Sequence, residues 1–215
     1  MRAIGPASQF QNVSTVFAID DDASYLRSLS RLLRASGYEV RTYGSAKEFL
    51  THLPEDAAGC VVADLQMPDL DGLGLQESLG RATNPLPVIF LTGQGDIPTT
   101  VQAMRMGAED FLTKTASKEK IVDAVNRALA RDAHSRQRRG RLKGLRDRFA
   151  ALSARELEVL GHVVRGKLNK QIAAELGITE RTVKLHRTNI TRTLQVHSVA
   201  ELTRLAHEAG LLEET

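Results

Sequence analysis

The sequence predicts two domains: an α/β domain with a doubly wound, five-stranded parallel sheet, followed by an all-α domain of four helices. Strand-like runs alternate with helical patterns five times over the first 130 residues, and no strand pattern appears after residue 150. The balance of basic and acidic side chains also differs between the two parts of the chain. Residues 1–130 carry 12 basic and 16 acidic side chains, whereas residues 131–215 carry 17 and 10. An acidic first part and a basic second part indicate two modules, the second lying near a polyanion.

Composition excludes several classes of protein. The 215 residues are 42% hydrophobic and 26% charged, which is typical of a globular protein and not of a disordered chain. No apolar run approaches the ~20 residues that span a bilayer, and the first residues lack the apolar core of a signal peptide. We therefore expect a cytoplasmic protein with no membrane partner. The single cysteine, Cys60, lies in a continuously apolar run and is expected to be a core side chain.

The five predicted strands are β-rich runs separated by segments with apolar residues at helical spacing. Leu26, Leu29 and Leu33 show this spacing after the first run, and Ser45 and Glu48 form a capping box before the next helix. Such an alternation predicts a parallel sheet with helices on both faces. The predicted strands are Val16–Ile19, Glu39–Thr42, Cys60–Ala63, Leu86–Leu91 and Asp110–Leu112.

The last third of the chain predicts four short helices. The second and third are separated by a tight turn, Leu176–Thr179, and the third is expected to run to about Leu194. This arrangement is the sequence form of a helix-turn-helix. The candidate N-caps of the four helices are Ser153, Asn169, Thr179 and Ser198.

These patterns divide the chain into a flexible tail at residues 1–13, an α/β domain at 14–131, a basic and partly helical linker at 132–148, and a helical domain at 149–215. Residues 131–150 hold 8 basic and 2 acidic side chains. This run is equally consistent with a solvated linker face and with direct contacts to phosphates.

Chemically useful side chains follow the predicted strands. Asp20 and Asp21 follow the first strand, Asp64 follows the third, Thr92 closes the fourth and Lys114 follows the fifth. The carboxyl ends of parallel strands meet at one crevice, so we expect these groups to lie together. Clustered carboxylates need a cation, and an oxygen-only cluster suits Mg²⁺. One carboxylate could then be a nucleophile toward a phosphoryl group, with the lysine and the threonine binding the phosphoryl oxygens.

These residues resemble the receiver domain of bacterial two-component response regulators, over about residues 14–131, and the resemblance implies a flavodoxin-like fold. It implies that Asp64 is the phosphoacceptor, and that Thr92, Phe111 and Lys114 act at the phosphoryl group or in the switch. For Phe111, simple core packing is the alternative. The implied Mg²⁺ ligands are Asp20, Asp21, Asp64 and the backbone carbonyl of Gln66.

One residue departs from the receiver pattern. The family usually has a proline, in a cis peptide, after the lysine, whereas this chain has Thr115. A cis bond before a residue other than proline costs about 2.5–4 kcal/mol, so we expect a trans bond here.

The charged residues of segment 179–194 are all positive after Glu180, while Val183, Leu185 and Ile190 are expected to form its apolar side. A helix of this kind, following a short helix and a glycine turn, can enter the major groove of DNA. The charge pattern alone also fits a surface helix of a protein-binding domain.

Residues 149–213 resemble the LuxR-type helix-turn-helix, and the order of the two domains is that of the FixJ/NarL group of regulators. The resemblance implies that this segment is a recognition helix. The DNA-binding residues that it implies are Lys170, Arg181, Thr182, Lys184, Arg187, Thr188, Asn189 and Arg192.

The resemblance implies a transcriptional response regulator with Mg²⁺ as cofactor. Its expected partners are a sensor histidine kinase, double-stranded DNA, a second copy bound through the 97–112 surface, and RNA polymerase. One alternative is a phosphorylation-independent DNA-binding protein with a degenerate receiver, which only Thr115 favours. The other is an Asp-nucleophile phosphohydrolase, but Gln66 stands where such an enzyme needs an acid/base Asp. We therefore expect no enzyme activity beyond slow self-dephosphorylation.

Overall fold

The computed structural model describes residues 14–93 and 97–211. It divides into two units, Met1–Arg136 and Gln137–Thr215, and each has its own hydrophobic core. Among the described residues, no helix is both long enough and apolar enough to cross a membrane.

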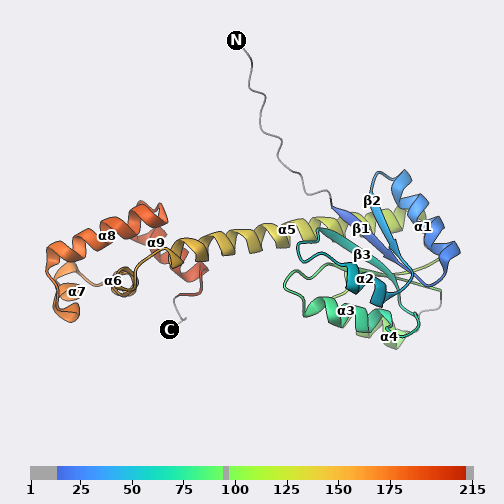
Figure 1. Cartoon of the computed structure of the whole chain (residues 1–215), viewed down its shortest axis with the longest axis horizontal. Coiled ribbons are helices and arrows are strands. Elements are labelled where there is room, and N and C mark those ends of the chain that lie inside the picture. The colour runs from blue at the N-terminus through green and yellow to red at the C-terminus, as the bar shows by residue number, and fades with distance from the viewer. Residues whose placement is uncertain (1–13, 94–96, 212–215) are drawn as a thin grey trace, which may run out of the picture. The chain divides into compact units, whose positions relative to one another are not determined.

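The first unit is built on a sheet of five parallel strands in the order β2-β1-β3-β4-β5. Figure 1 labels the first three of these, β2, β1 and β3. The order confirms the predicted doubly wound topology, in which the chain starts near the middle of the sheet and winds to both edges. The fourth strand begins two residues later than predicted, at Val88, because Pro87 has no N–H to donate to a neighbouring strand. The strands are β1 (Thr15–Ile19), β2 (Glu39–Tyr43), β3 (Gly59–Asp64), β4 (Val88–Thr92) and β5 (Asp110–Thr113).

Helices cover both faces of this sheet. On one face, Leu29 of α1, Val125 of α5 and Val62 of the central strand belong to one core. On the other face, Phe49 of α2 and Leu75 of α3 belong to a second core. The helices are α1 (Ala23–Ala35), α2 (Ala46–His52), α3 (Gly72–Gly80), α4 (Ile97–Arg105) and α5 (Lys118–Ala150).

The strand β3 is buried along its whole length, as expected for a central strand of a parallel sheet. Cys60 is fully buried within it, and burial raises the pKa of its thiol to about 12. A thiol with so high a pKa stays protonated and unreactive near neutral pH. This confirms Cys60 as a core side chain.

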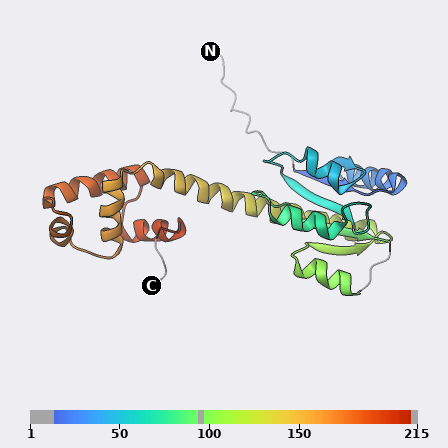
Figure 2. The ribbon, with the colours of Figure 1, turned by 60° about the horizontal axis from the view of Figure 1, so that its bottom comes forward.

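The second unit contains α6 (Ala154–Val164), α7 (Asn169–Leu176), α8 (Glu180–Leu194) and α9 (Val199–Glu208), together with the end of α5. The turn between α7 and α8 is visible in Figure 2. These helices enclose a core of apolar side chains. The helical domain that the sequence predicts is therefore confirmed.

Three of the four predicted N-caps are confirmed: the side chains of Ser153, Thr179 and Ser198 each accept a hydrogen bond from a backbone N–H three residues later. The fourth prediction is wrong, because Asn169 is already helical and Leu168 occupies the N-cap position. The side chain of Gln171 accepts from the N–H of Leu168 at 2.8 Å.

Residues 132–148, expected to be partly helical, lie wholly within α5. Gly140 and Gly144 disfavour a helix by about 1 kcal/mol each relative to alanine. Packing outweighs this cost, because Leu145 and Phe149 are buried in the core of the second unit.

Candidate functional site

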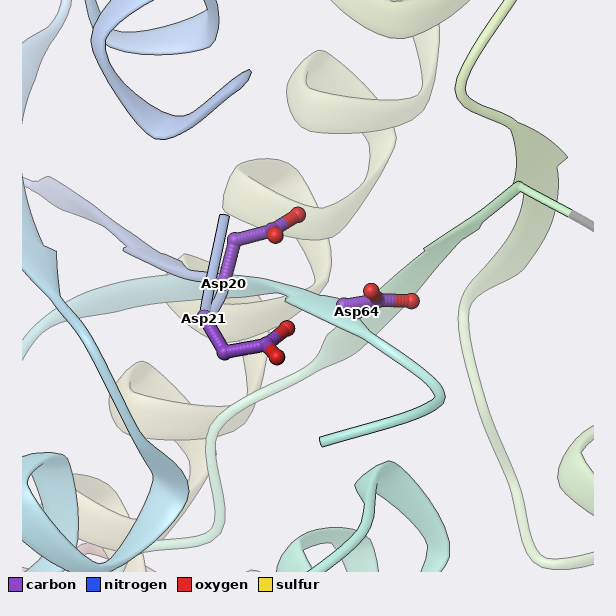
Figure 3. A group of neighbouring side chains, drawn as sticks. All are labelled: Asp20, Asp21 and Asp64. Carbon is purple, nitrogen blue, oxygen red and sulfur yellow. The ribbon is translucent and has the colours of Figure 1, made fainter. Parts of the chain in front are cut away.

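Three carboxylates lie together at the carboxyl ends of two neighbouring strands of the first unit. In the parallel pairing of β1 with β3, Ile19 lies opposite Ala63, so the next residues, Asp20 after β1 and Asp64 as the last residue of β3, lie side by side at this edge of the sheet. One carboxylate oxygen each from Asp20, Asp21 and Asp64 lies within 4.8 Å of the others. Figure 3 shows the three side chains projecting in the same direction. This arrangement brings together the acidic groups that the sequence predicts as one site.

Lys114 supplies the positive charge of this site. Its Nζ lies 2.7 Å from Oδ2 of Asp20 and 2.8 Å from Oδ2 of Asp64. The end of β5 positions the lysine, whose backbone N–H donates to the carbonyl of Thr92 at 2.8 Å. One ammonium group therefore bridges two buried carboxylates from different strands.

Burial and ion pairing act in opposite directions on these groups. Burial raises the pKa of Asp20 above its ordinary 3.8, although the hydrogen bond from Lys114 lowers it. Burial alone lowers the pKa of Lys114, but its hydrogen bonds to Asp20 and Asp64 together raise it above 10.5. Lys114 is therefore a cation at neutral pH.

The hydroxyl of Thr92 is a buried polar group without a partner. Thr92 ends β4, is 1% exposed, and its Oγ1 accepts or donates no hydrogen bond within the described part of the chain. A buried hydroxyl left unpaired costs about 1–3 kcal/mol.

The loop after β3 folds tightly against the site. A Cβ on Gly72 would lie 2.9 Å from the carbonyl oxygen of Asp64 and 2.7 Å from the ring of Phe90, so only glycine fits there. The N–H of Gln66 donates to Oδ1 of Asp64 at 3.2 Å, which places Gln66 at the edge of the pocket. Its carbonyl as a metal ligand stays a prediction.

Phe111 lies on β5 and has core contacts. Its ring centroid is 6.2 Å from that of Phe90, and the side chain packs against the core under α2 and α3. Its role in a switch stays a prediction.

The peptide bond between Lys114 and Thr115 is trans, as predicted, because the described chain contains no cis peptide bond. The sequence analysis missed a residue that touches this lysine. Tyr25 of α1 has its ring centroid 4.7 Å from Nζ of Lys114, and its hydroxyl donates to the carbonyl of Lys114 at 3.4 Å. The sequence feature that could have indicated this contact is the position of Tyr25 in the first turn of the helix that follows Asp21.

In the second unit, α8 presents a basic exposed face. Thr179 caps the helix by accepting from the N–H of Thr182 at 3.1 Å, and Gly177, with φ +64°, makes the turn before it. Buried side chains on the opposite face hold the helix to the core; they are Val183, Ile190 and Leu194. The exposed side chains of the helix after its first residue are Arg181, Lys184, Leu185, Thr188 and Arg192.

The exposed face contains an apolar side chain that the sequence analysis misplaced. Leu185 was expected on the apolar side of the helix but is 59% exposed. The reason is its helical position, two residues after the buried Val183 and therefore about 200° around the helix.

Several of the predicted DNA-binding residues have hydrogen-bond partners within the unit. Nη1 of Arg187 donates to Oδ1 of Asn169 at 2.9 Å, which ties α8 to α7 and explains why Asn169 does not cap its own helix. Asn189 accepts from Arg192 at 3.3 Å. The exposed Lys170 lies at the start of α7.

The two units match two families. Residues 16–126 match the response regulator receiver domain, and residues 150–206 match the bacterial regulatory proteins of the luxR family. The chain belongs to the two-component response regulators. Its first unit is the receiver domain, and its second is the LuxR-type DNA-binding domain.

Curated response regulators resemble the chain over most of its length. Nodulation protein W of Bradyrhizobium diazoefficiens is 40% identical over 98% of this chain and 92% of its own length. Response regulator protein TodT of Pseudomonas putida is 41% identical over 89% of this chain and 85% of its own. The transcriptional regulatory protein FixJ of Bradyrhizobium diazoefficiens is 36% identical over 93% of this chain and 97% of its own length.

Solved response regulators share the fold. The response regulator StyR is 44% identical and matches 91% of this chain and 98% of its own with a TM-score of 0.83. Full-length FixJ from B. japonicum is 36% identical, covers 93% of this chain and 98% of its own, and has a TM-score of 0.56. This confirms the predicted order of a flavodoxin-like receiver followed by a helical domain.

Proposed function

We propose that Asp64 accepts a phosphoryl group from a sensor histidine kinase in the presence of Mg²⁺, and that this event controls DNA binding through α8. The proposed receiver comprises residues 14–131, joined by a basic linker at 132–148 to a DNA-binding domain at 149–215. Because its partner is DNA, we place the protein in the cytoplasm.

The observation that carries this proposal is the ammonium group of Lys114 between Asp20 and Asp64. Two buried carboxylates that lie side by side repel each other when both are ionised, and a cation between them offsets this repulsion. The donor set also fits Mg²⁺, because it offers three carboxylate oxygens within 4.8 Å of one another. Mg²⁺ bound there would supply positive charge to the developing phosphoryl oxygens.

The residues of the pocket have distinct proposed roles. A carboxylate oxygen of Asp64 attacks the phosphorus; the new O–P bond forms as the bond from phosphorus to the donor's imidazole nitrogen breaks. Asp20, Asp21, Asp64 and the carbonyl of Gln66 would hold the metal. Lys114 binds a phosphoryl oxygen, and the unpaired hydroxyl of Thr92 donates to another.

Gln66 disfavours a phosphohydrolase. Its amide stands two residues after Asp64, where hydrolysis through an aspartyl phosphate needs a group that transfers protons. The phosphoryl group on Asp64 would therefore persist as a signal instead of turning over rapidly.

The proposed DNA contact is the exposed face of α8. Arg181, Lys184 and Arg192 lie on it and suit phosphates, while Thr182 and Thr188 can hydrogen-bond to base edges or phosphates. Arg187 and Asn189 would contribute after exchanging partners within the domain. Lys170 at the start of α7 adds a phosphate contact.

The proposed pairing surface spans residues 97–112. Within it, Ile97 is 80% exposed, and Val101, Met104 and Met106 are also exposed large apolar side chains. An apolar surface of this kind is expected to be covered by another protein. We propose a second copy of the chain as that protein after phosphorylation, with RNA polymerase as a further partner of the DNA-bound dimer.

The phosphorylation test uses Mg²⁺ and acetyl phosphate, with the phosphorylated form separated by Phos-tag gel electrophoresis. We expect the wild type to shift and Asp64→Asn to remain unshifted. The matched control is Asp69→Asn, an exposed carboxylate in the loop after β3, which should shift like the wild type. A shifted Asp64→Asn protein would refute the phosphoacceptor assignment.

The pairing test measures molar mass by light scattering with Mg²⁺, before and after addition of beryllofluoride as a phosphoryl mimic. We expect the wild type to change from monomer to dimer and Ile97→Lys to remain monomeric. An unchanged wild-type mass would refute pairing on phosphorylation and leave the phosphorylation test unaffected.

A further inference from the structure

Tyr25 contacts both the ammonium group and the backbone carbonyl of Lys114. The ring of Tyr25 faces the ammonium group, with 4.7 Å between Nζ and the ring centroid. Its hydroxyl donates to the backbone carbonyl of the same lysine at 3.4 Å. A single side chain of α1 thus holds both the backbone and the charged end of a residue in the loop after β5.

The position of Tyr25 is itself well defined. Its backbone N–H donates to Oδ1 of Asp22, the N-cap of α1, at 3.2 Å, and its side chain packs against the core shared by α1 and α5. The backbone around Lys114 is held by hydrogen bonds from the N–H of Lys114 to the carbonyl of Thr92 at 2.8 Å and from the N–H of Ala116 to that of Thr113 at 2.9 Å. These bonds do not fix the side chain of Lys114, and Tyr25 adds a contact to its ammonium group.

The contacts between Tyr25 and Lys114 matter most when a metal ion and a phosphoryl group are bound at the site, which rests on the function proposed above. Asp20 and Asp64, the two ion-pair partners of Lys114, would both also bind the metal ion. The carboxylate of Asp64 loses its charge when its oxygen bonds to phosphorus, and the phosphoryl oxygens then become the lysine's anionic partner. Tyr25 is neither a metal ligand nor a nucleophile, so its contacts with the lysine persist through that change. A cation over an aromatic ring is attracted without needing a carboxylate.

We propose that Tyr25 is a positioning residue for phosphoryl transfer, whose ring and hydroxyl hold Lys114 over the pocket while the carboxylates are occupied. Lys114 has a flexible four-carbon stem, and immobilising it before the reaction reduces the ordering required in the transition state. Tyr25 acts only through the lysine and does not touch the phosphoryl group.

The first experiment compares phosphorylation rates with acetyl phosphate for Tyr25→Phe and Tyr25→Leu. Tyr25→Leu removes ring and hydroxyl and is expected to lower the rate by about three- to tenfold, the size of a partly desolvated cation–π contact. Tyr25→Phe keeps the ring and should recover most of the lost rate. The matched control is Tyr38→Leu, a half-buried tyrosine of the same core that bonds Asn126 instead, which should leave the rate unchanged.

A double-mutant cycle separates positioning from a general structural role. In a Lys114→Ala background, Tyr25→Leu should cause no further loss of rate, because the residue through which it acts is gone. The Lys114 Hε signals provide a second readout, since they should lose their ring-current shift in Tyr25→Leu and keep it in Tyr25→Phe.

An equal loss of rate with and without Lys114, or a Tyr25→Leu rate equal to that of the wild type, would overturn the proposal. Neither result affects the assignment of Asp64, which depends on whether the wild type is phosphorylated and Asp64→Asn is not.

Discussion

The two domains place their charges in opposite ways. Within the described residues, every polar or charged residue that is buried as a whole lies in the first unit, which ends at Arg136, and these include Asp20, Asp64 and Asp132. The core of the DNA-binding domain is apolar, and its charges lie at the surface. Chemistry on a phosphoryl group benefits from charges fixed in a dry crevice, whereas phosphate binding on DNA needs charges that solvent and ligand can reach. Substitution of a single charged residue should therefore have a large effect in the receiver and a small effect in the DNA-binding domain.

The largest effect is expected at Asp132, a buried carboxylate that accepts from the N–H of Gly59 at 2.9 Å and from Nε of Arg136 at 2.8 Å. Asp132→Ala leaves both donors without their partner and should lower the free energy of unfolding of the receiver by about 3 kcal/mol. Hydrogen exchange of the β3 amides in the full chain measures this loss. Asp123→Ala, at an exposed position of α5, is the control, and equal protection in both variants would contradict the prediction.

The second-largest effect is expected for Lys114→Ala. It removes the cation that binds Asp20 and Asp64, and we expect phosphorylation by acetyl phosphate to slow by about 100-fold, as when one donor to a transition-state oxygen is removed. Phos-tag time courses measure the rate, with the exposed Lys118→Ala as control. A loss of less than threefold would show that this partly buried charge is dispensable, and that substitutions of charged residues have effects as small in the receiver as in the DNA-binding domain.

A smaller effect is expected for each basic residue of α8. Lys184→Ala should weaken DNA binding by about tenfold and reduce the slope of log K against log[salt] by about 1, because each phosphate contact releases about one counterion. Fluorescence anisotropy across a salt series measures both quantities. Arg204→Ala, an exposed arginine on α9, should leave the slope unchanged. Equal slopes for wild type and Lys184→Ala would exclude this lysine as a phosphate contact.

The smallest effect concerns the cap of α6. Hydrogen bonds from the backbone N–H and hydroxyl of Ser153 hold the pKa of Glu156 below its ordinary 4.5. A carboxylate whose pKa is lower in the folded state stabilises the domain above its unfolded pKa, and this stability is lost as pH falls through the folded value. Ser153→Ala should cost about 1 kcal/mol at pH 7 and less at pH 3. Urea unfolding of the DNA-binding domain at both pH values measures the difference, and a loss that does not shrink at low pH would contradict it.

The sequence predicted the sheet and the pocket well because both follow from strand order. Asp20, Asp64, Thr92 and Lys114 each stand at the end of a strand, so a parallel sheet alone brings them to one edge. Local signals were also sufficient for the caps at Ser153, Thr179 and Ser198, where the side chain bonds a backbone group three residues away.

Features that depend on contacts across the chain were missed. Tyr25 meets Lys114 across 89 residues, and no periodicity reports such a contact. Asn169 was predicted as an N-cap, but its side-chain oxygen accepts a hydrogen bond from the guanidinium of Arg187. The helix through Gly140 was expected to be only partly formed, because propensity does not include the packing that follows it at Leu145.

The most direct test of the account measures DNA affinity of the full chain with and without acetyl phosphate in Mg²⁺, using a DNA site selected from a random pool by the wild type. The account predicts that phosphorylation tightens binding by the wild type and leaves Asp64→Asn unchanged. The same affinity in both states of the wild type, with phosphorylation at Asp64 verified by mass spectrometry, would contradict the claim that this pocket controls the helix that binds DNA.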